Sequence, residues 1–340
     1  MTSSRILADD LTGALDAAAP FATPDAPVEI SFAAPSAAPH QTASSESREV
    51  PLAEALALVR ATHERLRAGT DAGTLWFKKV DSVLRGWPVE ETLELMRLLG
   101  CETCLFAPAF PEMGRRTLGG LHEVRDADRP GGWGPAEVHD LCAAFRAAGA
   151  EAEVFAPGSA KTGVLIGDAQ TEGELRALVG RLPAGGVLWA GSRGLAEALF
   201  PPRAPLAWPR LGTLIVGTTH PVTRRQVQAL RDTGIATDLR LIDPVPGAAT
   251  AAVTIERLEA ALAELSPPAE EALMVIGGNT LTAVLETTGA RALACEGEIA
   301  PGLPASRIVG GRLDGRQIIT KSGGFGSTGL LVELQATGRG

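Results

Sequence analysis

The sequence predicts an α/β protein with two domains, each containing a mostly parallel sheet flanked by helices. Short apolar runs alternate along the chain with stretches whose apolar residues recur at helical spacing, as strands and helices do when they alternate. The chain has 340 residues, more than one hydrophobic core usually serves. Residues 201–209 contain four prolines, which disfavour regular structure and favour a semi-rigid linker. We therefore expect domains at residues 1–205 and 211–340.

The strand and helix candidates follow in order along the chain. Strands are expected at short apolar runs, at residues 6–8, 75–77, 105–106, 163–166, 187–189, 213–216 and 273–276. Helices are expected where apolar residues recur every three or four positions, at residues 12–19, 52–68, 88–99, 135–148, 172–179, 221–233, 255–265 and 280–287. Residues 24–47 are rich in Ala, Pro and Ser and are expected to form either a surface loop or a degraded strand region.

Composition argues against several classes of protein. The net charge of −9 argues against a nucleic-acid-binding surface, and an aromatic content of 4% without tyrosine removes the usual base-stacking side chains. No apolar run approaches the roughly 20 residues that span a bilayer. The first residues reach a pair of aspartates too soon for a signal peptide. We therefore expect a cytoplasmic protein with neither a nucleic-acid nor a membrane partner.

Two of the four cysteines, Cys101 and Cys104, form a C-x-x-C pattern. A zinc site needs a second such pair or a nearby histidine cluster, and the sequence around this pattern has neither. The apolar run that follows predicts that one or both thiols lie in a strand. We expect the pattern to be structural rather than a redox or metal site.

The densest group of polar side chains lies at residues 78–86, with the sequence Lys-Lys-Val-Asp-Ser-Val-Leu-Arg-Gly. It directly follows the apolar run at 74–77, so it stands at the end of an expected strand. A buried charge costs several kcal/mol unless it is paired or meets a ligand. The segment is therefore either an internally paired network of Lys, Asp and Arg or part of a ligand site, and alone it does not decide between them.

A second polar group, Asp9 and Asp10, follows the first expected strand and precedes an Ala-rich helical stretch. One Asp at this place can cap the helix, which is worth roughly 1 kcal/mol. A cap needs only one carboxylate, and open α/β sheets place ligand contacts at the carboxyl ends of their strands. Two adjacent like charges also raise the pKa of one of them, which suits a proton acceptor. The pair therefore strengthens the ligand-site interpretation of residues 78–86.

Three glycine-bearing turns follow apolar runs in the second half, at residues 217–221, 277–280 and 320–326. A strand followed by glycines, small hydroxyls and a helix exposes backbone N–H groups to phosphate oxygens. Each turn alone is ordinary loop chemistry, but three in one domain favour a nucleotide site. There is no G-x-x-x-x-G-K-[ST] motif, which argues against a P-loop ATPase. Residues 324–329 fit G-x-G-x-x-G, but the acidic residue that a dinucleotide-binding fold needs about 20 positions later has no place before Gly340.

These blocks, taken in order, resemble the four-carbon acid sugar kinases. The similarity rests on Ala8-Asp9-Asp10-Leu11-Thr12-Gly13-Ala14, on Glu46-Ser47-Arg48, on residues 79–86, on 107–111 with Gly114-Arg115, and on 191–196. Residues 217–220, 277–280 and 321–326 resemble the nucleotide-side motifs. The similarity spans nearly the whole chain, and the Asp-Asp and Lys-x-Asp-Ser blocks are specific when they occur together.

The resemblance implies an enzyme that phosphorylates threonate, erythronate or a 3-oxo relative on its terminal hydroxyl. It implies a sugar-acid-binding domain at 1–205, an ATP-binding domain at 211–340 and an active-site cleft between them. ATP and Mg²⁺ are the expected cofactors, with the metal ligands unidentified. The expected partner is a small sugar acid, and association into a homo-oligomer is left open.

The resemblance and the residue chemistry together suggest roles for individual side chains. Arg48, Arg85 and Lys79 are candidates for binding the substrate carboxylate, the arginines as forks and the lysine as a point charge. Asp9, Asp81 and Ser82 are candidates for its hydroxyls. Asp10 is favoured as the catalytic base and as a further substrate contact, with Asp81 second as base. Nucleotide contacts are expected from Thr218, His220, Gly277, Gly278, Asn279, Thr280, Ser322, Gly323 and Gly324.

The chain departs from the family pattern at three positions. His220 replaces a small hydroxyl, Asn279 stands where Glu is common, and Val83 stands where Thr is usual. Two alternatives follow. One is a kinase of another small hydroxy acid, such as glycerate or a longer aldonate. The other is a catalytically inactive sugar-acid sensor.

Overall fold

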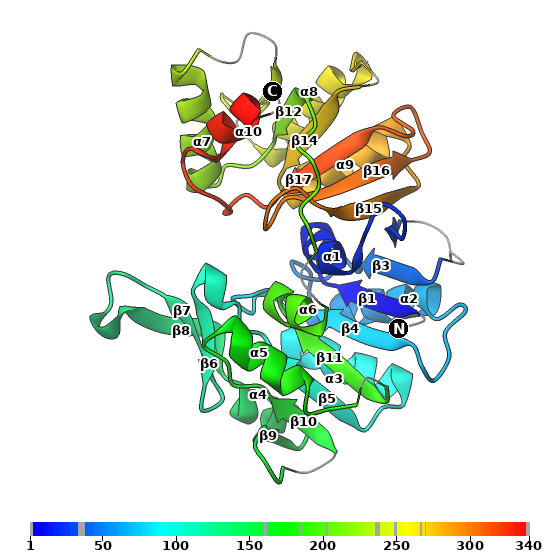
Figure 1. Ribbon diagram of the computed structural model, residues 1–340, viewed down its shortest axis with the longest axis vertical. Helices are drawn as coiled ribbons and strands as arrows, with labels where there is room; N and C mark the ends of the chain where they lie inside the picture. Colours follow the sequence, from blue (N-terminus) through cyan, green and yellow to red (C-terminus); the bar gives the residue numbers. More distant parts are fainter. Residues whose placement is uncertain are drawn as a thin grey trace. The chain divides into compact units, whose positions relative to one another are not determined.

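The computed structural model describes residues 3–32, 38–159, 162–183, 185–200, 203–234, 239–247, 250–265, 267–268 and 270–337 (Figure 1). It divides into two compact units: Met1–Pro20 with Ala34–Pro202, and Phe21–Ala33 with Arg203–Gly340. The functional roles expected for residues 1–205 and 211–340, and the cleft expected between them, stay predictions.

The first unit is built on a parallel sheet with the strand order β3-β1-β4-β11-β5-β10-β9. The strands are β1 (Ser4–Ala8), β3 (His40–Ser44), β4 (Leu75–Lys79), β5 (Thr103–Ala107), β9 (Ala152–Val154), β10 (Gly163–Ile166) and β11 (Val187–Gly191). Every residue of β1, β4, β5 and β11 is buried. Strands covered on both faces are mostly apolar, which is why short apolar runs located them in the sequence, although β1 also carries Arg5 and β4 ends in two lysines.

Helices cover this sheet, and several begin and end where the sequence predicts. They are α1 (Leu11–Ala18), α2 (Leu52–Leu66), α3 (Pro88–Leu99), α4 (Leu141–Ala147), α5 (Glu172–Val179) and α6 (Arg193–Leu199). Helix α3 begins at a proline and ends before Gly100, which adopts the left-handed conformation. Helix α5 begins with a capping box between Thr171 and Glu174. Helix α6 packs against both α1 and α5, while α2 packs on α3.

The prediction of a helix at 135–148 is wrong for its first part. Residues Trp133–Asp140 form β8, which completes a small antiparallel sheet with β6 (Arg115–Leu118) and β7 (Leu121–Arg125). The side chain of Asp140 accepts a hydrogen bond from Ala143 N, so the helix begins only at Leu141. Pro135, read from the sequence as a helix start, is paired with Glu123 in the sheet.

The second unit contains a mixed sheet with the order β13-β12-β14-β17-β16-β15-β2. The strands β12 (Leu211–Val216), β13 (Arg240–Ile242), β14 (Ala272–Ile276) and β17 (Gln317–Lys321) are parallel. The strands β2 (Val28–Ser31), β15 (Ala292–Glu298) and β16 (Pro304–Val309) are antiparallel to their neighbours here. The accompanying helices are α7 (Pro221–Asp232), α8 (Ala251–Ala263), α9 (Gly278–Thr288) and α10 (Leu330–Thr337). The α/β class with mostly parallel sheets is confirmed.

Strand β2 is the least expected element of this sheet. It comes from the N-terminal part of the chain, yet it pairs antiparallel with β15, with Val28 opposite Cys295. Of the two readings of residues 24–47, the strand reading is the better one, because β2 and β3 both lie there. Residues 33–37 of that stretch, and 201–202 of the proline-rich segment, lie outside the described residues. Residues 203–210 contain neither helix nor strand, as the prolines predict.

Each unit has its own hydrophobic core. In the first, Phe106 of β5 packs edge-on against Phe145 of α4 at a centroid distance of 4.9 Å. Cys104 is buried in β5, which confirms the strand expected for one thiol, while Cys101 lies just before it. None of the helices in the described part of the chain has the length and apolar character to span a membrane. The expected cytoplasmic location stays a prediction.

Candidate functional site

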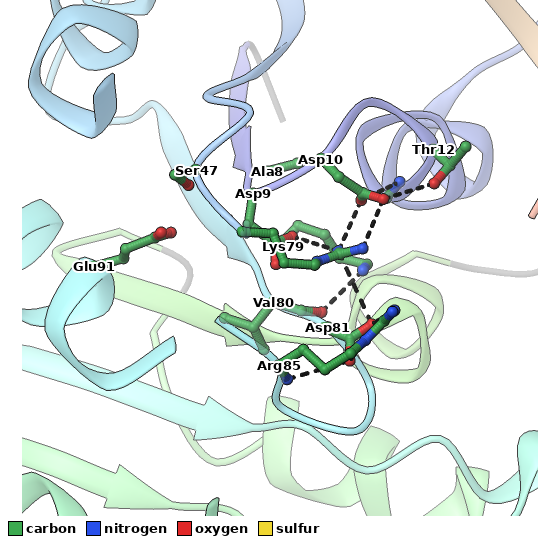
Figure 2. A network of polar contacts seen from close by, with 12 residues as sticks. Ala8, Asp9, Asp10, Thr12, Ser47, Lys79, Val80, Asp81, Arg85 and Glu91 are labelled. Atoms are coloured by element: carbon green, nitrogen blue, oxygen red, sulfur yellow. Dashed lines mark hydrogen bonds and ion pairs between the residues drawn. The ribbon is translucent and has the colours of Figure 1, made fainter. Parts of the chain in front are cut away.

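The polar residues of the first unit meet at the carboxyl ends of three neighbouring strands. Asp9 and Asp10 directly follow β1, Arg48 lies in the segment after β3, and Asp81 lies two residues after β4. Strand β1 lies between β3 and β4, with Ala8 paired to both Ser44 and Lys79. Parallel strands end at the same edge of a sheet, so the side chains of Asp9, Asp10 and Asp81 lie close together (Figure 2). Hydrogen bonds place Arg48 among them.

Arg48 is the centre of this cluster. Its Nε and Nη2 donate to the two carboxylate oxygens of Asp9 at 2.8 and 2.9 Å, and its Nη1 and Nη2 donate to those of Asp10 at 2.7 and 2.8 Å. The nearest Asp81 oxygen lies 3.9 Å away. These bonds occupy most of the five N–H groups of a guanidinium. Arg48 therefore acts first as the partner of the two aspartates.

The surroundings of Asp9 lower the pKa of its carboxyl group. The sequence predicts that one of two adjacent carboxylates has a raised pKa, and burial of Asp9 acts in that direction. The charge and hydrogen bonds of Arg48 act in the opposite direction, and so do the charges of Lys78 and Lys79. Together they outweigh burial, so the pKa of Asp9 is lowered. Asp9 is thus held as an anion, so it is not the carboxylate of the pair for which a raised pKa is expected.

Asp10 caps helix α1 and also binds Arg48. One oxygen accepts from Gly13 N and the other from the Thr12 hydroxyl, each at 2.8 Å. With the two bonds from Arg48, all four lone-pair positions of the carboxylate have donors. A Cβ on Gly13 would lie 2.5 Å from the Asp10 oxygen, so the close contact requires glycine. The capping interpretation is confirmed for Asp10. Asp9 does not cap the helix and lies at the end of β1, where it pairs with Arg48.

The loop after β4 is folded around Asp81. Arg85 Nε and Nη2 donate to its carboxylate at 3.0 and 2.8 Å, and the backbone N–H groups of Val83 and Arg85 donate at 3.2 and 3.3 Å. Burial raises the pKa of Asp81, but hydrogen bonds from Arg85 and the charges of Arg48, Arg85 and Lys79 lower it well below its ordinary value. Leu84, with φ of +64°, and Gly86, with φ of +79°, make the sharp turn.

The two adjacent lysines have different surroundings. Lys78 is buried and forms an ion pair of 2.8 Å with buried Glu91 of α3, a structural contact. Lys79 Nζ donates to Val80 O at 2.9 Å and lies near Gly13, where a Cβ would be 3.2 Å from it. Its charge lowers the pKa of both Asp9 and Asp81. Within residues 78–86 Arg85 pairs with Asp81, while Lys78 pairs with Glu91 outside the segment. Lys79 is buried, so half-exposed Arg85 is the cation of this segment that is most open to a ligand.

Sequence reasoning missed a support behind Ser82. The carbonyl oxygen of Ser82 accepts a hydrogen bond from Nε2 of His122 at 3.0 Å, and Nδ1 of His122 lies 3.0 Å from the Thr117 hydroxyl. The Nδ1 atom must accept here, because the carbonyl fixes the proton on Nε2. His122 is buried, and burial lowers its pKa, which keeps the ring neutral. Alternation along β6 and β7 could have shown that Thr117 and His122 face inward, but these strands were not predicted.

In the second unit the three glycine turns also share one edge of a sheet. They follow β12, β14 and β17, which are neighbours in that order. A Cβ on Gly217 would lie 2.3 Å from Thr280 Oγ1, and one on Gly323 would lie 2.9 Å from Thr218 Oγ1. Gly277 has φ of +107°. The turns are therefore packed closely enough that only glycine fits, and the predicted residues of all three are brought together.

His220 has a local role in this group. Its Nδ1 accepts from Val222 N at 3.2 Å and so caps α7, a task that a small hydroxyl also performs. A Cβ on Gly324 would lie 3.2 Å from its Nε2 atom. Gly278 and Asn279 lie in the first turn of α9, and Ser322 lies in the loop after β17. The substitution is therefore compatible with the turn.

The comparisons with known proteins agree with this arrangement. Residues 5–142 match a family model described as a sugar-binding N-terminal domain, and 245–331 match one described as a nucleotide-binding C-terminal domain. A D-threonate kinase of Cupriavidus necator is 31% identical over an alignment of 407 residues that covers 96% of this chain and 95% of that protein. The chain belongs to the four-carbon acid sugar kinase family.

Other members of the four-carbon acid sugar kinase family support the assignment. D-threonate kinases of Bordetella bronchiseptica and Salmonella typhimurium are 28% and 27% identical, each covering 96% of this chain and at least 95% of the relative. Two solved structures share the fold. One is from Salmonella typhimurium LT2 and carries a provisional description as a tRNA synthase, with TM-score 0.76, 18% identity and 99% of both chains covered. The other is from Haemophilus influenzae, with TM-score 0.71, 17% identity and 98% and 100% of the chains covered.

Proposed function

We propose that this chain is an ATP-dependent kinase that transfers the γ-phosphoryl group to the terminal hydroxyl of a four-carbon sugar acid: threonate, erythronate or 3-oxo-tetronate. The names of the relatives support this class of substrate. The observation that carries the proposal is the arrangement around Arg48. Three carboxylates and three cations meet at the ends of β1, β3 and β4. There the carboxylate of a small polyhydroxy acid can accept hydrogen bonds from the cations, and its hydroxyls can donate to the carboxylates.

The substrate carboxylate is assigned to Arg85 and Lys79 rather than to Arg48. Arg48 already donates four hydrogen bonds to Asp9 and Asp10 and is nearly buried. The side chain of Arg85 is 48% exposed, and its bonds to Asp81 use only Nε and Nη2, which leaves Nη1 for a ligand. Arg48 instead holds the two aspartates in place through these hydrogen bonds. Asp9, Asp81 and Ser82 stay candidates for the substrate hydroxyls.

Asp10 remains the favoured base and Asp81 the second choice. The lowered pKa of Asp81 makes it a weak proton acceptor. Asp10 already accepts four hydrogen bonds, so a substrate hydroxyl must displace one donor, and the Thr12 hydroxyl is the one that can rotate away. Phosphoryl transfer depends mostly on positioning and charge neutralisation. A carboxylate is therefore a sufficient base if the attacking hydroxyl loses its proton late in the transfer.

The glycine turns of the second unit fit a nucleotide. Membership of a kinase family together with the nucleotide-binding domain model implies nucleotide use. At Gly217, Gly277 and Gly323 the side chains of Thr218 and Thr280 pack into the space that a Cβ would fill, and glycines in such turns also allow phosphates to approach backbone N–H groups closely. No group of three or more His, Cys, Asp or Glu residues suited to a metal occurs in the part of the chain that the structure describes. We therefore expect Mg²⁺ to be held mainly by ATP phosphates and water, where it would neutralise charge.

The test is ADP release with Mg²⁺-ATP against D- and L-threonate, D- and L-erythronate, their 3-oxo forms and glycerate. Turnover on one four-carbon acid supports the proposal and identifies the substrate. Turnover only on glycerate would instead indicate the alternative kinase. Binding of a sugar acid without ADP release from any member of the panel would indicate the sensor.

A further inference from the structure

Lys321, at the end of β17, is a buried cation without an anionic partner. Its residue is 1% exposed. Within the described ranges no carboxylate lies at ion-pair distance from its ammonium group. Its Nζ donates instead to Ser322 O and Phe325 O, both at 2.9 Å, and lies 3.3 Å from the Thr223 hydroxyl. An unpaired buried charge is costly, so its retention needs a reason.

Two side chains of α7 reach the same loop and act in the same way. The Thr223 hydroxyl donates to Gly323 O at 2.6 Å. Gln226 Nε2 donates to Phe325 O at 3.0 Å and to Ser327 O at 2.7 Å. Both residues are fully buried. Together with Lys321, they bind the carbonyl oxygens of residues 322, 323, 325 and 327; we call these three side chains the carbonyl clamp.

The carbonyl clamp fixes the direction of the opposite groups. In a trans peptide, the C=O of one residue and the N–H of the next point in opposite directions. The N–H groups of Gly323, Gly324, Gly326 and Thr328 therefore point away from the clamp. Among the described residues none of these four N–H groups has a hydrogen-bond partner. A loop whose carbonyls are held inside and whose N–H groups are left outside is ready to bind an anion.

We propose that Lys321 is a positioning residue of the nucleotide site, which with Thr223 and Gln226 holds the carbonyl oxygens of residues 322–327 inward so that the opposite N–H groups receive nucleotide phosphates. This inference rests on the nucleotide use in the proposed function. The ammonium group supplies positive charge from beneath the loop, without touching the phosphates. Its cost is offset when the anion binds, because the bound phosphate is the missing counter-charge.

The inference has a consequence for proton binding. Burial lowers the pKa of Lys321 to about 8, and burial is its only cause. The α7 side chains that face Lys321, Thr223 and Gln226, are uncharged, and Arg224 beside them is paired with Asp243. A bound phosphate raises the pKa of a nearby ammonium group. Near pH 8 nucleotide binding is therefore accompanied by uptake of a fraction of a proton, whereas no uptake is expected at pH 6.5.

The experiment is calorimetric titration of the full chain with ADP at pH 6.5 and pH 8, in two buffers of different ionisation enthalpy. Lys321→Met is expected to bind ADP about 10- to 100-fold more weakly, because one or two N–H groups of the loop would no longer be positioned to bind the charged phosphates. This variant should also show no proton uptake. Thr223→Val should weaken ADP binding yet keep the uptake. Arg224→Met is the control. It removes a cation from α7 that pairs with Asp243 and does not bind the loop carbonyls, so this variant should bind ADP normally.

Three outcomes are distinguishable. Unchanged ADP affinity and unchanged proton uptake in a folded Lys321→Met variant would overturn the inference while leaving the kinase proposal in place. Normal ADP binding with the expected uptake, but no turnover of any sugar acid, would support the inference and overturn the kinase proposal. Failure of the unmodified protein to bind ADP would overturn both. Thermal unfolding of each variant shows whether it is folded.

Discussion

Gly86 lies against the backbone of Arg48, so that a Cβ on Gly86 would be only 3.1 Å from the Arg48 carbonyl oxygen. Gly86 also has φ of +79°, a conformation that other residues adopt only with strain. The turn after β4 is therefore packed directly on the segment that carries Arg48. This contact fixes the cation between Asp9 and Asp10 relative to the Asp81 turn.

Gly86→Ala should lower the free energy of unfolding by about 1–3 kcal/mol and reduce turnover further than that loss explains. The added methyl group displaces the backbone that positions Arg48. Urea unfolding and initial rates measure the two effects. Gly100→Ala is the control, because Gly100 has φ of +63° but nothing within 4 Å of its Cβ position. Equal loss of activity in both variants would contradict the role of the contact.

Arg48→Met should destabilise the protein by about 3–5 kcal/mol at pH 7, because it leaves a buried carboxylate unpaired. The pKa of Asp9 is lowered in the folded protein, so the stability it contributes is present above the ordinary Asp pKa and is lost as pH falls. The stability difference between the two proteins should therefore narrow below about pH 4. Arg60→Met, at a half-exposed pair with Glu94, should cost less than about 1 kcal/mol. A difference independent of pH would count against the pairing.

Arg85→Ala should greatly reduce turnover with little loss of stability. The side chain is half exposed, so its pair with Asp81 contributes little to folding, whereas its remaining N–H groups position the substrate. Turnover should fall at least about 100-fold, with ADP affinity unchanged. Arg129→Ala, at an exposed pair with Asp126, is the control and should keep full turnover. Unfolding of Arg85→Ala with sugar-acid binding intact in the folded fraction would show that the network is purely structural.

Asp10→Asn should reduce turnover by about 10²–10⁴-fold, the range for loss of a general base, and leave ADP affinity unchanged. The amide oxygen can still accept from Gly13 N, so helix α1 keeps its cap. Circular dichroism, ADP titration and turnover are compared on the same preparation. Near-normal turnover would remove Asp10 as the base, and Asp81→Asn would then be the next variant to measure.

The contribution of Lys321 to stability should change most in mild alkali. Its pKa of about 8 in the folded protein is below the ordinary lysine value, so between about pH 8 and 10.5 the unfolded chain binds more protons. The stability contributed by this residue should rise with pH across that window, by roughly 3 kcal/mol at most. Urea unfolding of the wild type and Lys321→Met at pH 7 and pH 10 measures it. A difference that does not change with pH would show that the ammonium group is not desolvated.

The parts of the fold with local signals could be predicted from the sequence. Helices α3 and α5 match the expected ranges because a proline, a glycine and a capping box mark their ends. The helix predicted at 135–148 is wrong at its start. Pro135 resembles the first residue of a helix, but its segment pairs with β7 in an antiparallel sheet. That pairing is a tertiary contact, and it overrides local propensity.

The site was predictable as a set of residues but not as a set of pairs. Asp9, Asp10 and Asp81 were identified because each follows an apolar strand. Their partners depend on strand order: β3 lies beside β1, which brings Arg48 to both aspartates. Arg48 is predicted from the sequence to bind the substrate carboxylate because spacing along the chain shows where charges lie but not which of them form ion pairs. The support of Ser82 by His122 likewise requires a sheet that was not predicted.

The pairing of β2 with β15 bears on how the chain is made and how it can be divided. Val28 leaves the ribosome long before its partner Cys295, because more than half of the sequence lies between them. The second unit therefore cannot complete its sheet until β15 has been translated, and until then the edge of β2 that pairs with β15 is open to other chains. A fragment that starts at Arg203 would lack this strand and leave β15 uncovered. A version of that fragment carrying residues 21–33 as a fused segment is the shorter form we expect to fold and stay monodisperse.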